Sequence, residues 1–107
     1  MHEIQTPGAA AQWLRERVTA TLRCDSRKLM PGDGFVAWPG AAVDARQFVN
    51  AALAQGAVAC LVEREGVAPL QLKDARIASY VGLKAHTGLI ASAFFARRWR
   101  WKVRRQW

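Results

Sequence analysis

Residues 24–62 carry one continuous series of structural signals, and this stretch constrains the fold more than any other part of the chain. Phe35–Trp38 is an apolar run short enough for a buried strand, and the turn signal Pro39-Gly40 ends it. Asp44 lies three residues before Gln47, which is the spacing of a capping box at the start of a helix. The sequence therefore predicts a strand, a connecting loop and a helix, in that order.

A second buried strand is expected after this helix. Gly56 suits the left-handed conformation that commonly ends a helix, and the helix before it carries the apolar residues Phe48, Ala51, Ala52 and Leu53. The run Ala57–Val62 is continuously apolar rather than alternating, which is typical of a strand covered on both faces. A strand–helix–strand unit of this kind pairs its two strands in parallel.

Further elements are predicted on both sides of this unit. Met1–Gln5 shows no pattern and is interpreted as a loose end, whereas Thr6 can cap a helix that has Pro7 at its first position. Leu22–Cys24 is interpreted as a short strand, and Ile77–Val81 is another strand candidate.

A helix over residues 83–96 would then close the domain. The chain has 107 residues, enough for one core, and its 51% hydrophobic and 22% charged residues are ordinary for a folded domain. The sequence predicts a single small α/β domain over residues 1–96, with a mixed, partly parallel sheet and helices packed on it.

Positive charge is concentrated after this domain. Six of the positive charges behind the net charge of +8 lie in residues 97–107, so residues 1–96 carry only +2. Three tryptophans alternate with these cations, an arrangement that could bind nucleic acid or an anionic membrane. The alternative interpretation is an out-of-frame or vector-derived ending on a truncated protein. Under that interpretation we expect a disordered tail.

The sequence lacks the residues that several classes of functional site require. Cys24 and Cys60 have neither redox-motif nor zinc-site spacing, and both are predicted to be buried free thiols. The sequence contains no GxxxxGK[ST], HExxH or GxSxG motif, and no histidine is expected near Ser26 to act as a base. No signal-peptide pattern and no apolar run of about 18 residues is found, so we expect a cytoplasmic protein. No catalytic residue and no metal site is predicted.

An ordered set of short motifs resembles the N-terminal domain of the Mur ligases, most closely of the MurE type. The motifs are Asp25-Ser26-Arg27, Pro31-Gly32-Asp33, Phe35-Val36-Ala37, Pro39-Gly40, Asp44 with Arg46, and Ala54-Gln55-Gly56-Ala57. MurE-type enzymes add the third peptide residue to UDP-N-acetylmuramoyl-L-alanyl-D-glutamate in peptidoglycan synthesis. The resemblance covers roughly residues 12–96 and implies that this nucleotide peptide, or a related UDP-sugar peptide, is the partner of a monomeric domain.

The resemblance also implies a site for the uridine part of the substrate. Carried over by position, its residues are Cys24, Ser26, Ala41, Ala42 and Val43. A uracil ring needs an apolar slot with a few donors and acceptors, which Ser26 and backbone groups of an alanine-rich loop could supply. The alternative is that Ser26 only caps a turn and that the loop only connects two elements.

The chain departs from the family pattern in two places. Many MurE-type sequences have polar side chains at the positions of Ala41 and Ala42 and a glycine at that of Ala45, so binding here would rely on backbone contacts. Each neutral hydrogen bond lost is worth roughly 0.5–1.5 kcal/mol, so we expect weaker binding. After Phe94-Phe95 the family continues to a phosphate loop and to domains for ATP, magnesium and the amino acid. We therefore expect no ATP or magnesium site and no ligase activity in this chain alone.

Overall fold

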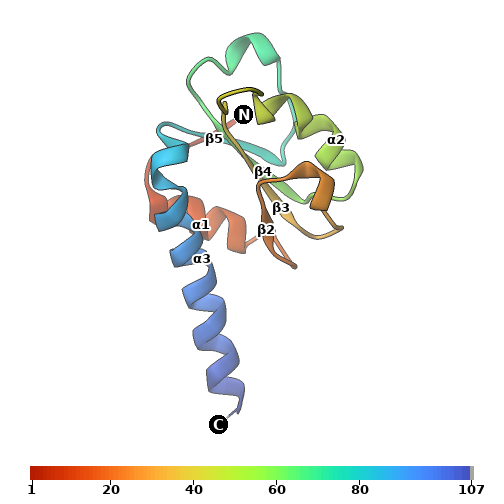
Figure 1. Ribbon diagram of the computed structural model, residues 1–107. Coiled ribbons are helices and arrows are strands. Elements are labelled where there is room, and N and C mark those ends of the chain that lie inside the picture. The colour runs from red at the N-terminus through yellow and green to blue at the C-terminus, as the bar shows by residue number, and fades with distance from the viewer. Residues whose placement is uncertain (107) are drawn as a thin grey trace.

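The computed structural model of the chain describes the backbone of residues 1–106 and the side chains of residues 1–96. It contains the α-helices and strands of Figure 1 and, in addition, short 3-10 helices, which are named η. Their order is β1 (His2–Ile4), α1 (Pro7–Arg15), β2 (Leu22–Arg23), η1 (Ser26–Lys28), β3 (Gly34–Ala37), η2 (Ala45–Phe48), α2 (Val49–Ala54), β4 (Ala59–Glu63), η3 (Ala68–Leu70), β5 (Ile77–Tyr80) and α3 (Leu83–Gln106).

The strands form one five-stranded sheet in the order β1-β5-β4-β3-β2. Every pairing in this sheet is parallel, so the α/β class is confirmed, while the expected mixture of parallel and antiparallel strands is corrected. The expected loose end at Met1–Gln5 is also wrong, because His2–Ile4 pairs with Ala78–Tyr80 of β5 as an edge strand. Since all strands run in the same direction, their carboxyl ends meet at one edge of the sheet.

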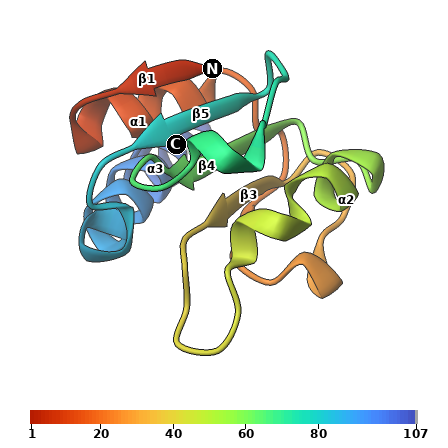
Figure 2. The same cartoon turned by 90° about the horizontal axis from the view of Figure 1, so that it is seen from above.

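Helices cover both faces of the sheet. Figure 2 shows α1 and α3 on one side and α2 on the other. Alternate strand residues face the two sides, because successive side chains in a strand point in opposite directions. Val36, Leu61 and Tyr80 pack in the cluster that contains α1 and α3, whereas Phe35 and Cys60 pack in the cluster that contains α2. The continuous apolar runs predicted as doubly covered strands are confirmed.

The helix ends show which local predictions were right. The Thr6 hydroxyl accepts a hydrogen bond from the Ala9 N–H and Pro7 opens α1, as predicted. The Asp44 carboxylate caps the start of η2 by accepting from the Arg46 N–H, so its predicted role at a helix start is confirmed. The capping box with Gln47 is wrong, because the carboxylate also accepts from the Arg46 guanidinium and the Gln47 N–H donates to the Asp44 carbonyl. A 3-10 turn, η2, therefore precedes α2 where a single helix was expected.

Helix α3 runs past its expected end near Ala96, to Gln106. No glycine or proline follows Ala96, and arginine and lysine are good helix formers, so the local sequence does not stop a helix there. The side chains of the basic segment 97–107 lie outside the described residues, and its predicted disorder stays a prediction. No helix among the described residues is both long and apolar enough to span a membrane.

Candidate functional site

A pocket of about 550 Å³ opens between the end of β2 and the start of η2. It lies beyond the carboxyl ends of β2 and β3, the position at which ligands bind in open parallel sheets. In Figure 2 the loop that joins β3 to η2, drawn in yellow, extends outward from the sheet. The pocket is lined by Cys24, Asp25, Ser26, Arg27, Phe35, Val43, Ala45 and Phe48.

Three of the five expected uridine-site residues come together here. Cys24 and Ser26 line one wall and Val43 lines the other. Ala41 and Ala42 lie in the loop beside Val43, but they are exposed and are not part of the lining. Whether any of the five binds a ligand stays a prediction.

Aromatic side chains line part of this pocket, a role that was not predicted for them. Phe35 is fully buried beneath it, and Phe48, the last residue of η2, is 40% exposed. Phe35 was predicted only as part of a buried strand, and Phe48 only as an apolar residue of the helix that follows. With the half-exposed Val43 they supply an apolar surface of the kind that a flat heterocyclic ring can contact.

One wall of the pocket is held by an ion pair within the Asp25-Ser26-Arg27 motif. The Asp25 carboxylate accepts hydrogen bonds from the Arg27 backbone N–H at 2.9 Å and from Nε and Nη2 of Arg27 at 3.1 and 3.0 Å. These hydrogen bonds from Arg27 lower the pKa of Asp25 to about 2. The carboxylate in the wall is therefore ionised at neutral pH and its charge is offset by the guanidinium.

A buried aspartate fixes the segment that carries this wall. The Asp33 carboxylate accepts hydrogen bonds from the Thr21 N–H at 3.1 Å, the Met30 N–H at 2.9 Å and Arg23 Nε at 3.2 Å. Burial alone would raise the pKa of Asp33, but these three donors lower it below the ordinary value. Because Thr21 and Met30 stand on either side of Cys24–Lys28, Asp33 holds both ends of the segment.

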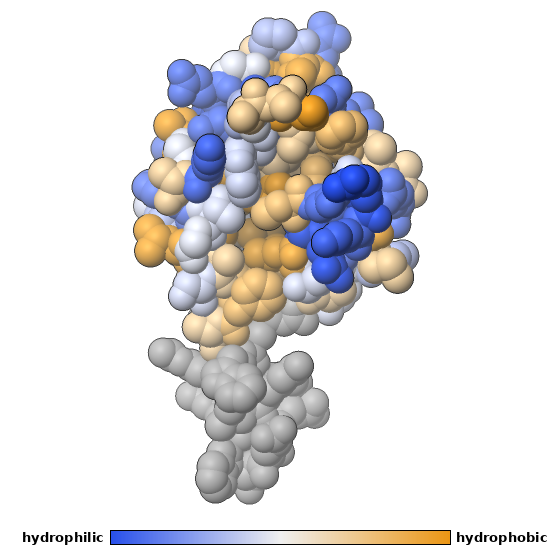
Figure 3. Space-filling model, in the orientation of Figure 1, coloured by the Kyte–Doolittle hydropathy of each residue, from blue (hydrophilic) through white to orange (hydrophobic). Residues whose placement is uncertain are grey.

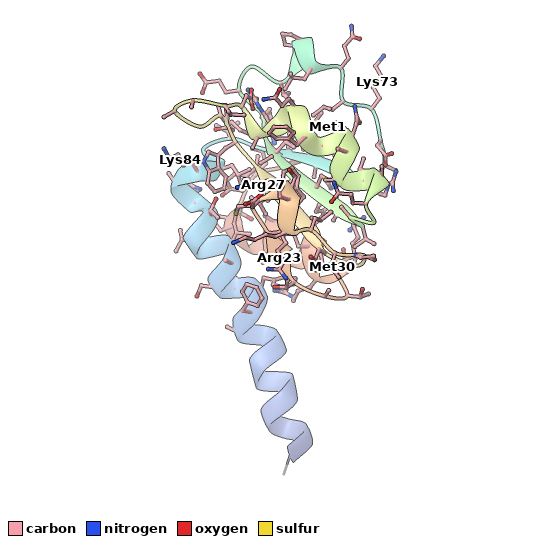
Figure 4. The ribbon with its side chains drawn as sticks, turned by 45° about the vertical axis from the view of Figure 1, so that its right-hand side comes forward. Met1, Arg23, Arg27, Met30, Lys73 and Lys84 are labelled. Atoms are coloured by element: carbon pink, nitrogen blue, oxygen red, sulfur yellow. The ribbon has the colours of Figure 1, made fainter. Side chains whose placement is uncertain are left out.

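Figure 3 gives a space-filling view of the face seen in Figure 1, and Figure 4 gives the side chains on the ribbon. A hollowed, hydrophobic area lies next to a strongly hydrophilic patch in Figure 3, and Figure 4 shows Arg23 and Arg27 beside η1.

Cys24 also borders a second, smaller apolar hollow of about 140 Å³ against α3. The prediction of a buried Cys24 is wrong: its position just after an edge strand leaves it exposed, although partial burial raises the pKa of its thiol. Cys60 is buried, as predicted.

Comparison with known protein families decides the relationship of this chain to others. The sequence model described as "Mur ligase family, catalytic domain" matches residues 19–95. The chain belongs to the Mur ligase family.

Individual Mur ligases are similar over most of the chain. It is 57% identical over 95 residues to the UDP-N-acetylmuramoyl-L-alanyl-D-glutamate–2,6-diaminopimelate ligase of Acidovorax sp. (strain JS42), covering 89% of the chain and 19% of that protein. The ligase of the same name from Pseudomonas putida is 41% identical over 81 residues, which are 76% of the chain and 16% of that protein. The chain thus spans about a fifth or less of the length of these relatives.

Among the described residues, no group of three or more His, Cys, Asp or Glu side chains could hold a metal ion. His86 is half-buried, with Nδ1 at 2.8 Å from the Tyr80 hydroxyl, and it is not part of the pocket lining.

Proposed function

We propose that this Mur ligase domain binds the UDP part of a UDP-N-acetylmuramoyl peptide in the pocket between β2 and η2. The proposal rests on one observation. Cys24, Ser26 and Val43 come from two separate segments of the chain and line the same pocket at the carboxyl edge of the sheet. The relatives' names point to UDP-N-acetylmuramoyl-L-alanyl-D-glutamate as the natural ligand.

The chemistry of the pocket supports a uracil ring. Phe48 and Val43 offer apolar surface for the faces of the ring, and the Ser26 hydroxyl can donate to or accept from its polar edge. The Asp25 charge is offset by Arg27, so it opposes an anionic nucleotide less than an unpaired carboxylate would. Because Ala41 and Ala42 lack polar side-chain groups, the loop can contribute only backbone hydrogen bonds, and affinity for UDP alone should be low.

We propose that the domain acts as a monomeric binding module. Because the sequence contains no phosphate-loop motif, we also propose that ATP and magnesium bind elsewhere in longer members of the family. A cytoplasmic location stays a prediction.

Titration with UDP followed by amide NMR shifts tests the proposal. We expect saturable shifts confined to residues 24–26 and 40–48 at millimolar UDP, and much weaker shifts with ADP, which carries the same diphosphate on a different base. Amides of these segments that stay still at millimolar UDP, or that respond equally to ADP, would contradict a uridine site.

A matched pair of variants makes this test specific. Val43→Asp places a negative charge in the pocket wall and should weaken UDP binding. Val81→Asp changes a residue of similar exposure, 55% against 49% for Val43, that is not part of the lining. If both variants bind UDP like the unchanged chain, the ligand lies elsewhere.

A further inference from the structure

Three Asp-x-Arg pairs in this chain share one geometry. In Asp25–Arg27, Asp44–Arg46 and Asp74–Arg76, the aspartate accepts the backbone N–H of the arginine two residues later and also pairs with its guanidinium. The arginine side chains differ in exposure: 87% for Arg27 and 48% for Arg76, but only 6% for Arg46. Among these three arginines only Arg46 is therefore buried, whereas the three aspartates are similarly exposed, at 35% for Asp25 and Asp44 and 30% for Asp74.

The buried guanidinium joins two segments that lie far apart in the sequence. Nε and Nη2 of Arg46 contact the Asp44 carboxylate, with a shortest distance of 2.8 Å. Nη1 donates to the carbonyl oxygen of Glu63, the last residue of β4, at 2.8 Å and to that of Glu65, in the turn that follows, at 2.7 Å. Arg46 thus links the loop before η2 to a turn anchored on a central strand of the sheet.

Asp44 is the residue through which this link reaches the pocket. It forms an isolated antiparallel bridge with Pro39, and within the loop the Gly40 N–H donates to the Val43 carbonyl at 2.8 Å. The Ala45 N–H donates to the Trp38 carbonyl at 3.4 Å. The two ends of the loop therefore meet at the residue that Arg46 holds, one position after Val43 in the pocket wall.

The conformation of the Trp38–Asp44 loop decides which polar groups it can offer to a ligand. Ala41 and Ala42 have no polar side-chain groups that could adjust to a ligand. The polar groups that the loop can offer at these positions are backbone N–H and C=O groups, whose directions are set by the loop conformation. A fixed conformation limits the ordering cost of binding, which favours affinity.

We propose that Arg46 is a positioning residue of the nucleotide pocket, which holds the Trp38–Asp44 loop in its binding conformation by anchoring Asp44 to the turn at Glu63–Glu65. The inference rests on the proposed function for the ligand, and on the described contacts for the link itself. Arg46 is not in the pocket lining and acts through the loop.

The test compares Arg46→Lys with the matched control Arg76→Lys. Lysine keeps the charge, but its single ammonium cannot contact a carboxylate and two carbonyls in the arrangement of the guanidinium fork. We expect Arg46→Lys to raise the Kd for UDP about three- to tenfold, the equivalent of one or two hydrogen bonds, and the control to change it by less than about twofold. Asp44→Asn, which retains an oxygen for the Arg46 N–H, should have an intermediate effect.

Hydrogen exchange measured without UDP separates loop positioning from general stability. In Arg46→Lys, the Gly40 and Ala45 amides should exchange faster, while amides of β4 and β5 remain as protected as in the unchanged chain. Equal acceleration of all amides, or unchanged exchange with unchanged Kd, overturns the proposal. If the unchanged chain does not bind UDP, the proposed function fails, and with it the role in binding, even where exchange confirms the loop anchor.

Discussion

Pro31 packs directly against Gly56: a Cβ atom on the glycine would lie 2.8 Å from Cα of the proline. The Gly32 N–H also donates to the Gly56 carbonyl at 3.0 Å, and the φ angle of Gly56 is +111°. The end of α2 is therefore joined to the turn before β3 by a contact that leaves no space for a side chain.

Gly56→Ala should accordingly destabilise the domain. Both the positive φ and the collision with a rigid proline backbone oppose a methyl group, so we expect the free energy of unfolding to fall by about 1–3 kcal/mol. Gly88→Ala is the matched control, since nothing lies within 4 Å of its added Cβ in the interior of α3. There alanine should add about 0.5–1 kcal/mol. Urea unfolding measures both, and equal midpoints would contradict the packing described.

Replacing Asp33 by alanine should remove more stability than replacing Asp74. The Asp33 side chain is 1% exposed and leaves two backbone donors and Arg23 without their acceptor when removed, at a cost of about 2–4 kcal/mol. Asp74 pairs with Arg76 at a more exposed position, so Asp74→Ala serves as the control. Chemical denaturation of the two variants at pH 7 measures the difference. Similar losses would show that Asp33 does not hold its segment.

The pH dependence of stability at the acid side should involve the same aspartate. The pKa of Asp33 is lowered in the folded state, so its contribution is present above the ordinary value of 3.8 and is lost as pH falls through the lowered pKa. Melting temperatures between pH 7 and pH 2 should therefore fall less steeply for Asp33→Ala than for the unchanged chain. Parallel curves would exclude Asp33 as a source of acid lability.

Cys60 should make the domain sensitive to alkali. Burial raises the pKa of its thiol from 9.0 to about 12, so the unfolded thiol ionises between these values while the folded thiol stays neutral. The stability that the neutral Cys60 thiol contributes is thus fully present below pH 9.0 and is lost as pH rises toward about 12. Cys60→Ala should flatten the decline in melting temperature from pH 8 upward, and Cys24→Ala, which removes a thiol that is only partly buried, should flatten it less. Tyr80, whose pKa burial also raises, contributes equally in both variants.

No ADP release is expected when the chain is mixed with ATP, magnesium, diaminopimelate and the UDP-muramoyl dipeptide. The backbone and lysine of a glycine-rich phosphate loop contact the transferred phosphates in such reactions, and this motif does not occur in the sequence. A coupled assay for ADP measures the rate. Release that depends on the amino acid would require a phosphate site of another kind.

The central part of the fold could be predicted because its signals are local. Phe35–Trp38, Gly56 and Ala57–Val62 each indicate an element within a few residues, and β3, the end of α2 and β4 formed there. The edge strand His2–Ile4 could not be predicted, because its strand conformation depends on pairing with residues more than seventy positions later. Whether the outer strands pair in parallel or antiparallel could not be predicted either, because such short strands carry no sequence signal for their pairing.

Only part of the pocket lining could be predicted, again because the rest depends on the tertiary structure. The family resemblance located Cys24, Ser26 and Val43 in the pocket lining, but which loop side chains face inward depends on the loop conformation. Arg46 was missed as an anchor because its Asp-x-Arg pattern occurs three times in the sequence. Burial against Glu63 and Glu65, which distinguishes it from Arg27 and Arg76, is a property of the tertiary structure alone.

The position of β1 at the far edge of the sheet has a consequence for the order of synthesis. Because the ribosome makes chains from the amino end, β1 emerges before β5, its pairing partner, in any chain that contains both. Until residues 77–80 have emerged, the backbone donors and acceptors of His2–Ile4 have no strand to join and the apolar face of α1 has no α3 to pack on. During synthesis β1 therefore cannot join the sheet until β5 has been made.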